Sequence, residues 1–264
     1  MRPGGNTVLI TGGASGIGLA LAELFIAAGN SVVVCGRDQT RLDLACARLP
    51  GLAAMRADLT DPAARAALAH DIRQRFPALN VLVNNAGRVQ VCDLTDPSHV
   101  EVLEREVAVN LLAPVALTSL LLPALRDRPG ATIVNITSGY VFLPSARTAP
   151  YSATKAAMHA MTRGLRFRLR GSGVRVVEVM PPAVDTAMAT HYPGPKLTTP
   201  VAARQIFRGL LRGDEEIVIG LSRLARLLSR LAPATAFAVM NRLELRPVPA
   251  VSLPHFLLGR RRAG

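Results

Sequence analysis

The stretch Thr11-Gly12-Gly13-Ala14-Ser15-Gly16-Ile17-Gly18 decides the fold. It follows a short apolar run at residues 7–11 and precedes a helical pattern at residues 17–28. Glycines at 12, 16 and 18 permit a tight turn, a close approach of the backbone to a bound group, and close packing of the helix on the strand. The free N–H groups at the start of such a helix bind anions such as phosphates. Taken alone the turn also suits an ordinary strand–helix connection, but its place between strand and helix favours a nucleotide site.

Short β-branched runs alternate with longer helical patterns along the chain. The expected strands lie at residues 7–11, 31–35, 52–57, 81–84, 132–136, 174–180 and 216–219. The expected helices lie at residues 17–28, 39–48, 62–76, 103–126, 151–170 and 200–211. Such alternation implies right-handed crossovers between parallel strands. We therefore predict an α/β fold: a single Rossmann-type doubly wound parallel sheet with helices on both faces, forming one domain over residues 1–264.

Two segments depart from this alternation. Residues 181–199 are rich in proline, threonine and glycine, which predicts a loop, and we assign residues 181–215 as a substrate loop or lid region. Residues 221–264 form a basic C-terminal extension with short helix candidates at 221–231 and 233–241. Its arginines at 223, 226 and 230 share one helical face, and three more stand at 260–262. We expect residues 221–264 to help close the substrate side or to mediate assembly, with the arginine face near anionic surfaces. A helix simply packed on the domain is the alternative.

The composition is that of a compact globular protein with a basic surface. Hydrophobic residues make up 50% of the chain and aromatics 4%, with no Trp, so aliphatic side chains must build the core. The formal net charge is +13, yet only Lys155 and Lys196 are lysines and the arginines are spread along the chain. This pattern favours a solvated basic surface, with attraction to an anionic partner as the alternative. Basic runs interleaved with aromatics do not occur, so no nucleic-acid partner is expected.

Cysteine and histidine spacing indicates neither disulfides nor a metal site. Cys35, Cys46 and Cys92 lack metal or redox spacing and are typical of reduced thiols in a cytoplasmic protein. The histidines show no metal spacing, and we expect them at the surface: His70, His99, His159, His191 and His255. No run of eighteen apolar residues is free of charge, proline and asparagine, so we expect no transmembrane segment. Peripheral membrane contact is left open.

A tyrosine–lysine pair supplies the candidate chemistry. Tyr151 and Lys155 are four residues apart, so on a helix both side chains emerge from one face. An ammonium about 4 Å from a phenol favours the phenolate by about 4 kcal/mol at an effective dielectric of about 20, so we expect a lowered Tyr151 pKa. Such a phenol can pass a proton to and from an alcohol near neutral pH. Asn110 lies in a long apolar pattern, where an amide needs hydrogen-bond partners.

The end of the second strand, Gly36-Arg37-Asp38, bears on the choice of cofactor. An NAD site places an acidic residue there to accept from the ribose 2′-hydroxyl. Glycine stands at that position, and the adjacent arginine can bind a 2′-phosphate through paired hydrogen bonds. Asp38 is the alternative, since it could reach the ribose. NADP(H) is therefore favoured, with NAD(H) possible.

Together these motifs resemble the short-chain dehydrogenase/reductase (SDR) family. They are Thr-Gly-x-x-x-Gly-x-Gly at 11–18, Asn-Asn-Ala-Gly at 84–87, Asn110, Ser138 and Tyr-x-x-x-Lys at 151–155. The resemblance runs from about Val8 to Gly220. Within the family, residues 6–9, 34–38, 110–114 and 180–188 are most similar to the DltE-type oxidoreductases.

The resemblance implies a role for each matched residue. Tyr151 would be the general acid in reduction and the general base in oxidation, and Lys155 would lower its pKa and hold the nicotinamide ribose. Ser138 would bind the substrate oxygen, and Asn110 would hold a water in a proton relay. The cofactor would contact a longer set of residues: Thr11, Gly12, Ser15, Gly16, Ile17, Gly18, Arg37, Asp58, Leu59, Asn85, Ala86, Gly87, Tyr151, Lys155, Pro181, Val184 and Thr186.

Two positions depart from the family pattern. Pro182 stands where the family commonly has glycine, which should stiffen the loop near the nicotinamide. Ser15 stands where many NADP-preferring members have Arg or Lys.

The implied reaction moves a hydride between NADP(H) and a carbonyl or secondary alcohol of a small, partly hydrophobic substrate. We expect pocket walls at 88–93, 139–150 and 182–199, with apolar contacts from 141–143 and a polar end from Arg88, Arg147 and His191. The substrate residues would be Gly139, Tyr140, Pro182, Met188 and Tyr192. The alternatives are a catalytically vestigial protein that binds the cofactor or docks to a membrane, and a related fold that catalyses epimerisation or dehydration. Family members are commonly dimers or tetramers, so we expect a homodimer or homotetramer.

Overall fold

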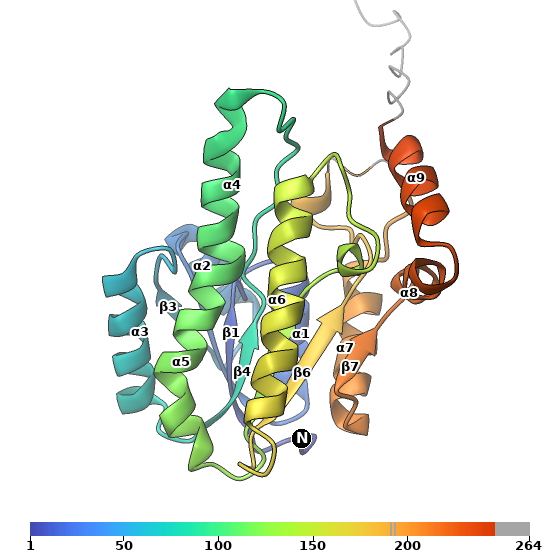
Figure 1. Cartoon of the computed structure of the whole chain (residues 1–264). Coiled ribbons are helices and arrows are strands. Elements are labelled where there is room, and N and C mark those ends of the chain that lie inside the picture. Colours follow the sequence, from blue (N-terminus) through green and yellow to red (C-terminus); the bar gives the residue numbers. More distant parts are fainter. Residues whose placement is uncertain (191, 193, 246–264) are drawn as a thin grey trace, which may run out of the picture.

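The computed structural model describes residues 1–190, 192 and 194–245 (Figure 1). Within this part of the chain, parallel strands form one sheet in the order β3-β2-β1-β4-β5-β6-β7. Their bounds are β1 (Thr7–Thr11), β2 (Ser31–Gly36), β3 (Leu52–Arg56), β4 (Leu79–Asn84), β5 (Thr132–Ile136), β6 (Arg175–Met180) and β7 (Glu216–Val218). The doubly wound sheet predicted from the sequence is confirmed.

Helices cover both faces of this sheet. One face carries α1 (Gly16–Ala27), α2 (Gln39–Arg48) and α7 (Thr199–Arg212). The other face carries α3 (Pro62–Arg75), α5 (Ala113–Arg126) and α6 (Ala149–Arg168). Because side chains alternate along a strand, Val8 and Ile10 of β1 join the first layer whereas Leu9 joins the second.

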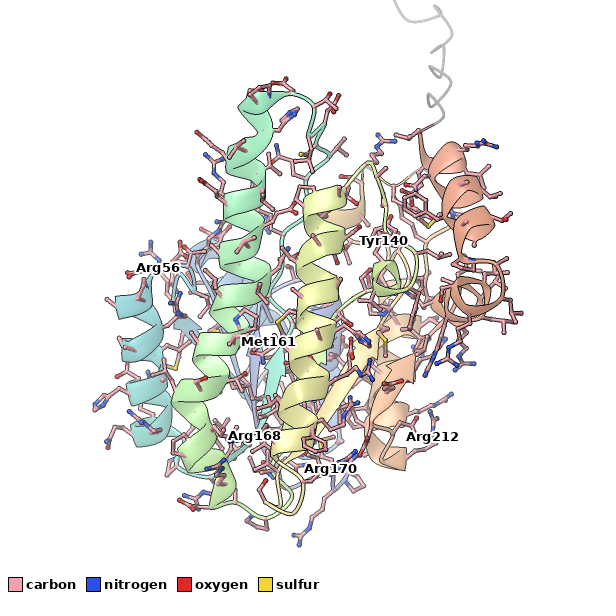
Figure 2. The ribbon with its side chains drawn as sticks, in the orientation of Figure 1. Arg56, Tyr140, Met161, Arg168, Arg170 and Arg212 are labelled. Carbon is pink, nitrogen blue, oxygen red and sulfur yellow. The ribbon has the colours of Figure 1, made fainter. Side chains whose placement is uncertain are left out.

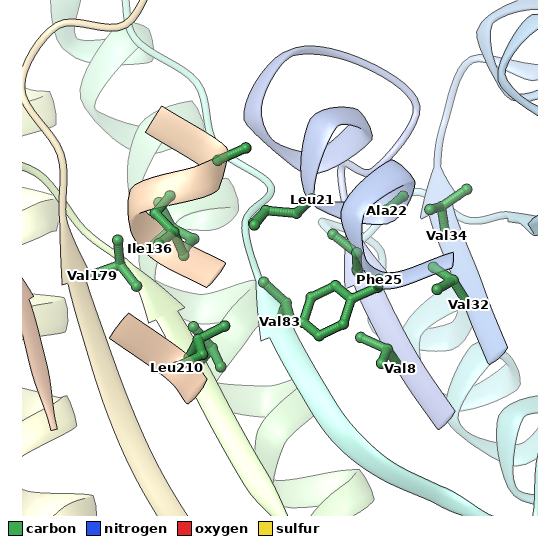
Figure 3. Close-up of a cluster of buried hydrophobic side chains, with 14 of the residues drawn as sticks. Val8, Leu21, Ala22, Phe25, Val32, Val34, Val83, Ile136, Val179 and Leu210 are labelled. Atoms are coloured by element: carbon green, nitrogen blue, oxygen red, sulfur yellow. The ribbon is translucent and has the colours of Figure 1, made fainter. Parts of the chain in front are cut away.

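Aliphatic residues build the core, as the scarcity of aromatics requires. Phe25 of α1 is an exception: it is fully buried and meets the Phe207 ring of α7 edge to face at 5.2 Å. Figure 3 shows Phe25 beside Val8 and Val83 of the sheet, with Leu210 of α7 nearby. This packing joins α1 to α7 and so fixes the helix that follows the glycine turn.

The strand order reverses between β1 and β4, because the chain leaves β1 towards β2 on one side and later returns to β4 on the other. In open parallel sheets, ligands bind in the crevice at the carboxyl ends of the strands beside such a switch point. The residues after β1, β4, β5 and β6 all lie at this edge. They include the glycine turn, the residues after Asn84, Ser138 and the Pro181 segment.

The helix expected at residues 103–126 is interrupted. The structure has α4 (Val100–Val107), a π turn at Ala108–Leu112 that contains Asn110, and then α5. Such π turns often occur at functional sites. By length and composition the combined stretch Pro97–Arg126 could cross a membrane, but α5 packs on β4 and α3, with Leu117, Leu121 and Leu125 fully buried. The stretch belongs to the domain's helical layer.

The assignment of residues 181–215 as a lid region is too long. From Thr199 onwards the chain forms α7, whose Ala202, Ala203 and Ile206 are buried against α1 and the sheet. Their burial makes this segment part of the core. The loop-like part is residues 181–198, which holds a short 3₁₀ turn at Ala187–Ala189 and a bridge between Val184 and Leu197.

Two helices follow the sheet: α8 (Ser222–Leu231) and α9 (Pro233–Glu244). Figure 1 shows them at one edge of the molecule, next to the loop that follows β5. Arg260, Arg261 and Arg262 of the expected basic extension, and His191 of the expected pocket, lie outside the described residues.

Candidate active site

The glycine turn forms an anion cradle between β1 and α1. Gly12 and Gly16 adopt φ angles of 63° and 53°, which side-chain-bearing residues rarely adopt. A Cβ at Gly18 would lie 2.7 Å from the carbonyl oxygen of Gly12, so the helix could not start this close to the strand with any larger residue. Within the described chain, the Ser15 hydroxyl makes no capping hydrogen bond, so it leaves the first N–H groups of α1 to a ligand.

Thr11 and Asn85 hold this turn to the end of β4. The Thr11 hydroxyl accepts hydrogen bonds from the backbone N–H groups of Asn85 (3.0 Å) and Ala86 (2.9 Å). The Asn85 amide donates in return to the carbonyl oxygens of Thr11 (2.9 Å) and Gly12 (3.2 Å). These bonds fix the two loops that flank the switch point relative to each other.

Tyr151, Lys155 and Ser138 come together beyond β5. Tyr151 and Lys155 project from the same face of α6, and the Lys155 ammonium lies 5.5 Å from the centre of the Tyr151 ring. The buried ammonium also donates to the Ile136 carbonyl oxygen at 2.9 Å, which anchors it to the end of β5. Ser138 follows β5 in extended conformation, and its hydroxyl caps the turn at Gly139–Val141 by accepting from the Tyr140 N–H.

The expected lowering of the Tyr151 pKa is wrong for this arrangement. Burial dominates and raises the pKa of Tyr151 to about 12, while a hydrogen bond with the Ser138 hydroxyl lowers it only in part. Lys155 responds in the opposite sense, because burial lowers its pKa to about 8. The Lys155 ammonium, 5.5 Å from the ring centre, does not offset the effect of burial on the Tyr151 phenol. Tyr151 is therefore a phenol at neutral pH, the form that donates a proton.

Asn110 lies in the π turn and joins the same group. Its side-chain oxygen accepts from the Arg88 N–H at 2.8 Å, and its amide donates to the Arg88 carbonyl at 2.8 Å and the Thr154 hydroxyl at 3.1 Å. A Cβ at Gly87 would lie 3.4 Å from the Asn110 oxygen and 3.7 Å from Lys155 Nζ. Both side chains thus converge on Gly87, where the absence of a side chain leaves room.

The segment after β6 closes over these loops. Thr186 Cγ2 would lie 3.1 Å from a Cβ at Gly16, and Met188 Cε would lie 3.8 Å from a Cβ at Gly87. Val184 is buried, and Pro181 accepts a hydrogen bond from the Gly139 N–H at 2.8 Å. The segment therefore crosses from the glycine turn to the Tyr151 group.

The expected substrate residues do not all face one space. Tyr140 meets the Tyr151 ring edge to face at 6.1 Å. Burial raises the pKa of Tyr140, and the neighbouring Glu244 and Tyr192 raise it further. Gly139 is different: it is buried, and a Cβ there would lie 2.4 Å from the Ser222 hydroxyl of α8. Gly139 thus faces α8, and Pro182 packs towards Gly220.

The residues expected near the adenosine lie at the ends of β2 and β3. Arg37 is exposed and acts on Asp58, lowering the pKa of its carboxyl, although hydrogen bonds from Thr60 lower it more. Asp58 and the buried Leu59 start the segment after β3. Asp38, the alternative ribose contact, caps α2 by accepting from the Arg41 N–H at 3.1 Å and pairs with the Arg41 guanidinium at 3.2 Å.

Comparison with known proteins decides the family. The family profile described as short chain dehydrogenase matches residues 6–195. The chain belongs to the short-chain dehydrogenase/reductase family. The uncharacterized oxidoreductase DltE of Bacillus subtilis (strain 168) is 42% identical over 189 residues, which are 71% of this chain and 75% of that protein.

Solved structures agree with this result. A short-chain dehydrogenase from Burkholderia cenocepacia J2315 in complex with NADP superposes with a TM-score of 0.81 at 25% identity, covering 94% of this chain and all of that one (100%). A short-chain dehydrogenase from Sphingobium yanoikuyae in complex with NADPH gives a TM-score of 0.76 at 29% identity, covering 95% and 100%. The protein is an NAD(P)-dependent short-chain dehydrogenase/reductase, similar to DltE.

Sequence reasoning missed three buried carboxylates of this SDR, which are Glu106, Glu244 and Glu178. Glu106 of α4 is fully buried; one oxygen accepts from the Gln90 N–H at 2.6 Å, and the other finds no partner among the described residues. Burial raises the pKa of Glu106 to about 7. Its place four residues before Asn110 in an apolar helix was the available signal.

The second missed residue is Glu244 at the end of α9. It is buried and accepts hydrogen bonds from the Tyr140 hydroxyl at 2.9 Å and from the Ser145 hydroxyl. No spacing in the sequence links it to Tyr140, because the two residues come from distant segments. His159 also departs from its expected surface position, since its ring contacts the buried Glu178 carboxylate at 2.9 Å.

Proposed function

We propose that this SDR transfers a hydride between NADP(H) and a carbonyl or secondary alcohol of a small, partly hydrophobic substrate. The observation that carries the proposal is the convergence of Tyr151, Lys155 and Asn110 beside Ser138 at the switch-point edge. Binding a cofactor without turnover would not require a buried lysine between a phenol and an amide. The vestigial alternative therefore has no comparable support.

The chain's residues fit a dinucleotide. The uncapped N–H groups of α1 and the positive φ angles of Gly12 and Gly16 suit a pyrophosphate, and Thr186 stands across from Gly16. The nicotinamide of the bound cofactor would supply or accept the hydride. Lys155 would hold the ribose hydroxyls.

The residues around the substrate oxygen would handle the proton. In reduction, Tyr151 donates its phenolic proton to the oxygen of the carbonyl as the hydride arrives at carbon. Ser138 hydrogen-bonds that oxygen and keeps it within reach of the phenol. Because burial keeps Tyr151 protonated at neutral pH, the resting enzyme is ready for reduction. In oxidation the phenolate form of Tyr151 would accept the proton of the alcohol.

NADP(H) is favoured over NAD(H) by the end of β2. Gly36 provides no carboxylate to repel a 2′-phosphate, Arg37 is exposed beside that position, and Asp38 is occupied as the cap of α2. The NADP and NADPH complexes of the two structural relatives support the same preference.

Turnover of the Tyr151→Phe variant tests the proposal. A panel of aldehydes and ketones is followed by the loss of NADPH absorbance, and the best substrate is then used with the variant. The change removes the transferable proton but keeps the ring that packs on Tyr140, so kcat should fall by about two to four orders of magnitude while NADPH affinity changes little. The NADPH affinity and the thermal melting temperature of the variant are the controls for folding and cofactor binding. Near wild-type turnover by Tyr151→Phe would refute the assignment.

A further inference from the structure

The helices α8 and α9 expose apolar side chains and bury polar ones. The α8 residue facing the domain is Ser222, and the buried residues of α9 are Asn241 and Glu244. Asn241 donates to the Pro144 carbonyl at 3.1 Å and accepts from the Ala146 N–H, while Glu244 holds Tyr140. Polar contacts therefore attach the helix pair to the loop that follows Ser138.

The outward faces of both helices are apolar. On α8, Leu224, Leu227 and Leu231 follow helical spacing and are 51%, 52% and 73% exposed. On α9, Val239 and Leu243 are 49% and 54% exposed. Single exposed leucines are ordinary, but several adjacent ones on two consecutive helices indicate a surface that binds another molecule or a membrane.

Arginines flank this apolar face. Arg223, Arg226 and Arg230 occupy the neighbouring side of α8, and Arg242 is exposed on α9. Beside α8, a hollow of about 600 Å³ is lined by arginines from α7 and α8. These arginines are Arg208, Arg212, Arg223 and Arg226. Two of them form ion pairs, Arg212 with Asp214 and Arg226 with Glu216. Figure 2 shows Arg212 projecting from α7 on this side of the molecule.

The excess of arginine on α8 and α9 favours an anionic partner. Residues 221–245 contain four arginines and one acidic residue, Glu244, which is buried. A contact between two copies through α8 would bring the arginine rows of both copies together, at a cost in like-charge repulsion. An anionic bilayer offers the opposite charge and an apolar layer at once. A helix with leucines on one side and arginines on the other is the pattern that lies in such an interface.

We propose that α8 and α9 form a docking surface for a membrane rich in anionic phospholipid. Leu224, Leu227 and Leu231 enter the boundary between headgroups and acyl chains. Arg230 and Arg242 bind lipid phosphates. Docking in this orientation would bring the loop carrying Tyr140 close to the bilayer, because α9 is bonded to that loop.

Cosedimentation of the full chain with vesicles tests the proposal. Vesicles of phosphatidylcholine alone are compared with vesicles containing about 30% phosphatidylglycerol, at low and at high salt. We expect strong binding only to the anionic vesicles and at low salt, since each arginine near an anionic surface contributes about fivefold to partitioning (about 1 kcal/mol). Equal binding to neutral vesicles, or none to either, would overturn the proposal.

Two variants and one control locate the surface. Leu224→Gln/Leu227→Gln/Leu231→Gln should reduce anionic-vesicle binding at least tenfold, and Arg230→Gln/Arg242→Gln should reduce it about twenty-fivefold. The control Leu44→Gln/Val100→Gln/Phe167→Gln removes equally exposed apolar side chains elsewhere and should bind like wild type.

Two measurements keep these outcomes interpretable. Circular dichroism and thermal melting establish folding, which exposed substitutions should preserve. Light scattering gives the molecular mass. If the leucine variant halves the mass of the protein and leaves vesicle binding unchanged, a second copy covers this face and the membrane proposal is wrong. The readout is binding, so it is independent of whether the proposed reaction occurs.

Discussion

Replacing Arg37 by alanine should weaken NADPH binding about tenfold and leave NADH binding almost unchanged. The guanidinium follows Gly36 at the carboxyl end of β2, on the side where the adenine ribose of a dinucleotide would lie. A hydrogen bond to a charged group contributes about 1.5–3 kcal/mol. Because Arg37 is exposed to solvent, we take the lower end of that range, which corresponds to about one decade in affinity at 1.4 kcal/mol per decade.

Fluorescence titration of both reduced cofactors against wild type and Arg37→Ala measures the effect. Arg41→Ala is a matched control, because that neighbouring arginine is already paired with Asp38. A second variant, Gly36→Asp, should invert the preference by repelling the 2′-phosphate and accepting from a 2′-hydroxyl. The site has room for it, since a Cβ there would lie 3.8 Å from Leu42. Equal losses for both cofactors in Arg37→Ala, or no loss for NADPH, would refute the reasoning.

Three further predictions concern stability and its pH dependence. Gly13→Ala should lower the free energy of unfolding by about 1–3 kcal/mol in urea denaturation, because a Cβ there would lie 2.4 Å from Val34 Cγ1. An unchanged free energy of unfolding would show that the Val34 side chain moves aside without cost. Asp38→Ala should cost about 1 kcal/mol by removing the cap of α2 while leaving the NADPH-to-NADH affinity ratio intact, and a changed ratio would mean that Asp38 contacts the ribose. The raised Glu106 pKa of about 7 means that the folded state keeps a proton that the unfolded state loses, so stability should fall by up to about 3 kcal/mol as pH rises from 4.5 to 7. Glu106→Gln should reduce this slope in urea melts at several pH values, and an unchanged slope would exclude Glu106 as a source.

The regular elements could be predicted from the sequence because local pattern determines them. The helix at 39–48 and the strand at 132–136 have the predicted bounds, since continuous β-branched runs and capped helical stretches are local signals. The structure also brings the predicted motif residues together, because the parallel topology places the strand ends at one edge. The π turn at Ala108–Leu112 escaped prediction, as nothing local distinguishes it from ordinary helix.

The electrostatics of the site could not be predicted, because they depend on burial rather than spacing. The spacing of Tyr151 and Lys155 predicted the shared helix face. It did not predict the position of the ammonium over the ring, nor that burial would affect the Tyr151 pKa more than the ammonium does. Sequence pattern likewise gave the arginine side of α8 without showing that the leucine side faces outward. Which face of an amphipathic helix is covered depends on tertiary contacts, here the polar contacts of Ser222, Asn241 and Glu244.

Those contacts make the C-terminal helices part of the active-site wall. Glu244 holds the Tyr140 hydroxyl, and the Tyr140 ring stands edge to face against Tyr151, so a displacement of α9 would act directly on the ring next to the proposed proton donor. The family match ends at residue 195, well before α8 begins. The contacts that α9 makes with Tyr140 therefore lie outside the residues that the family profile matches. Substrate preference near Tyr140 has to be measured on this chain. The same helix links the apolar docking face to Tyr140, so membrane contact and substrate selection would depend on one structural element.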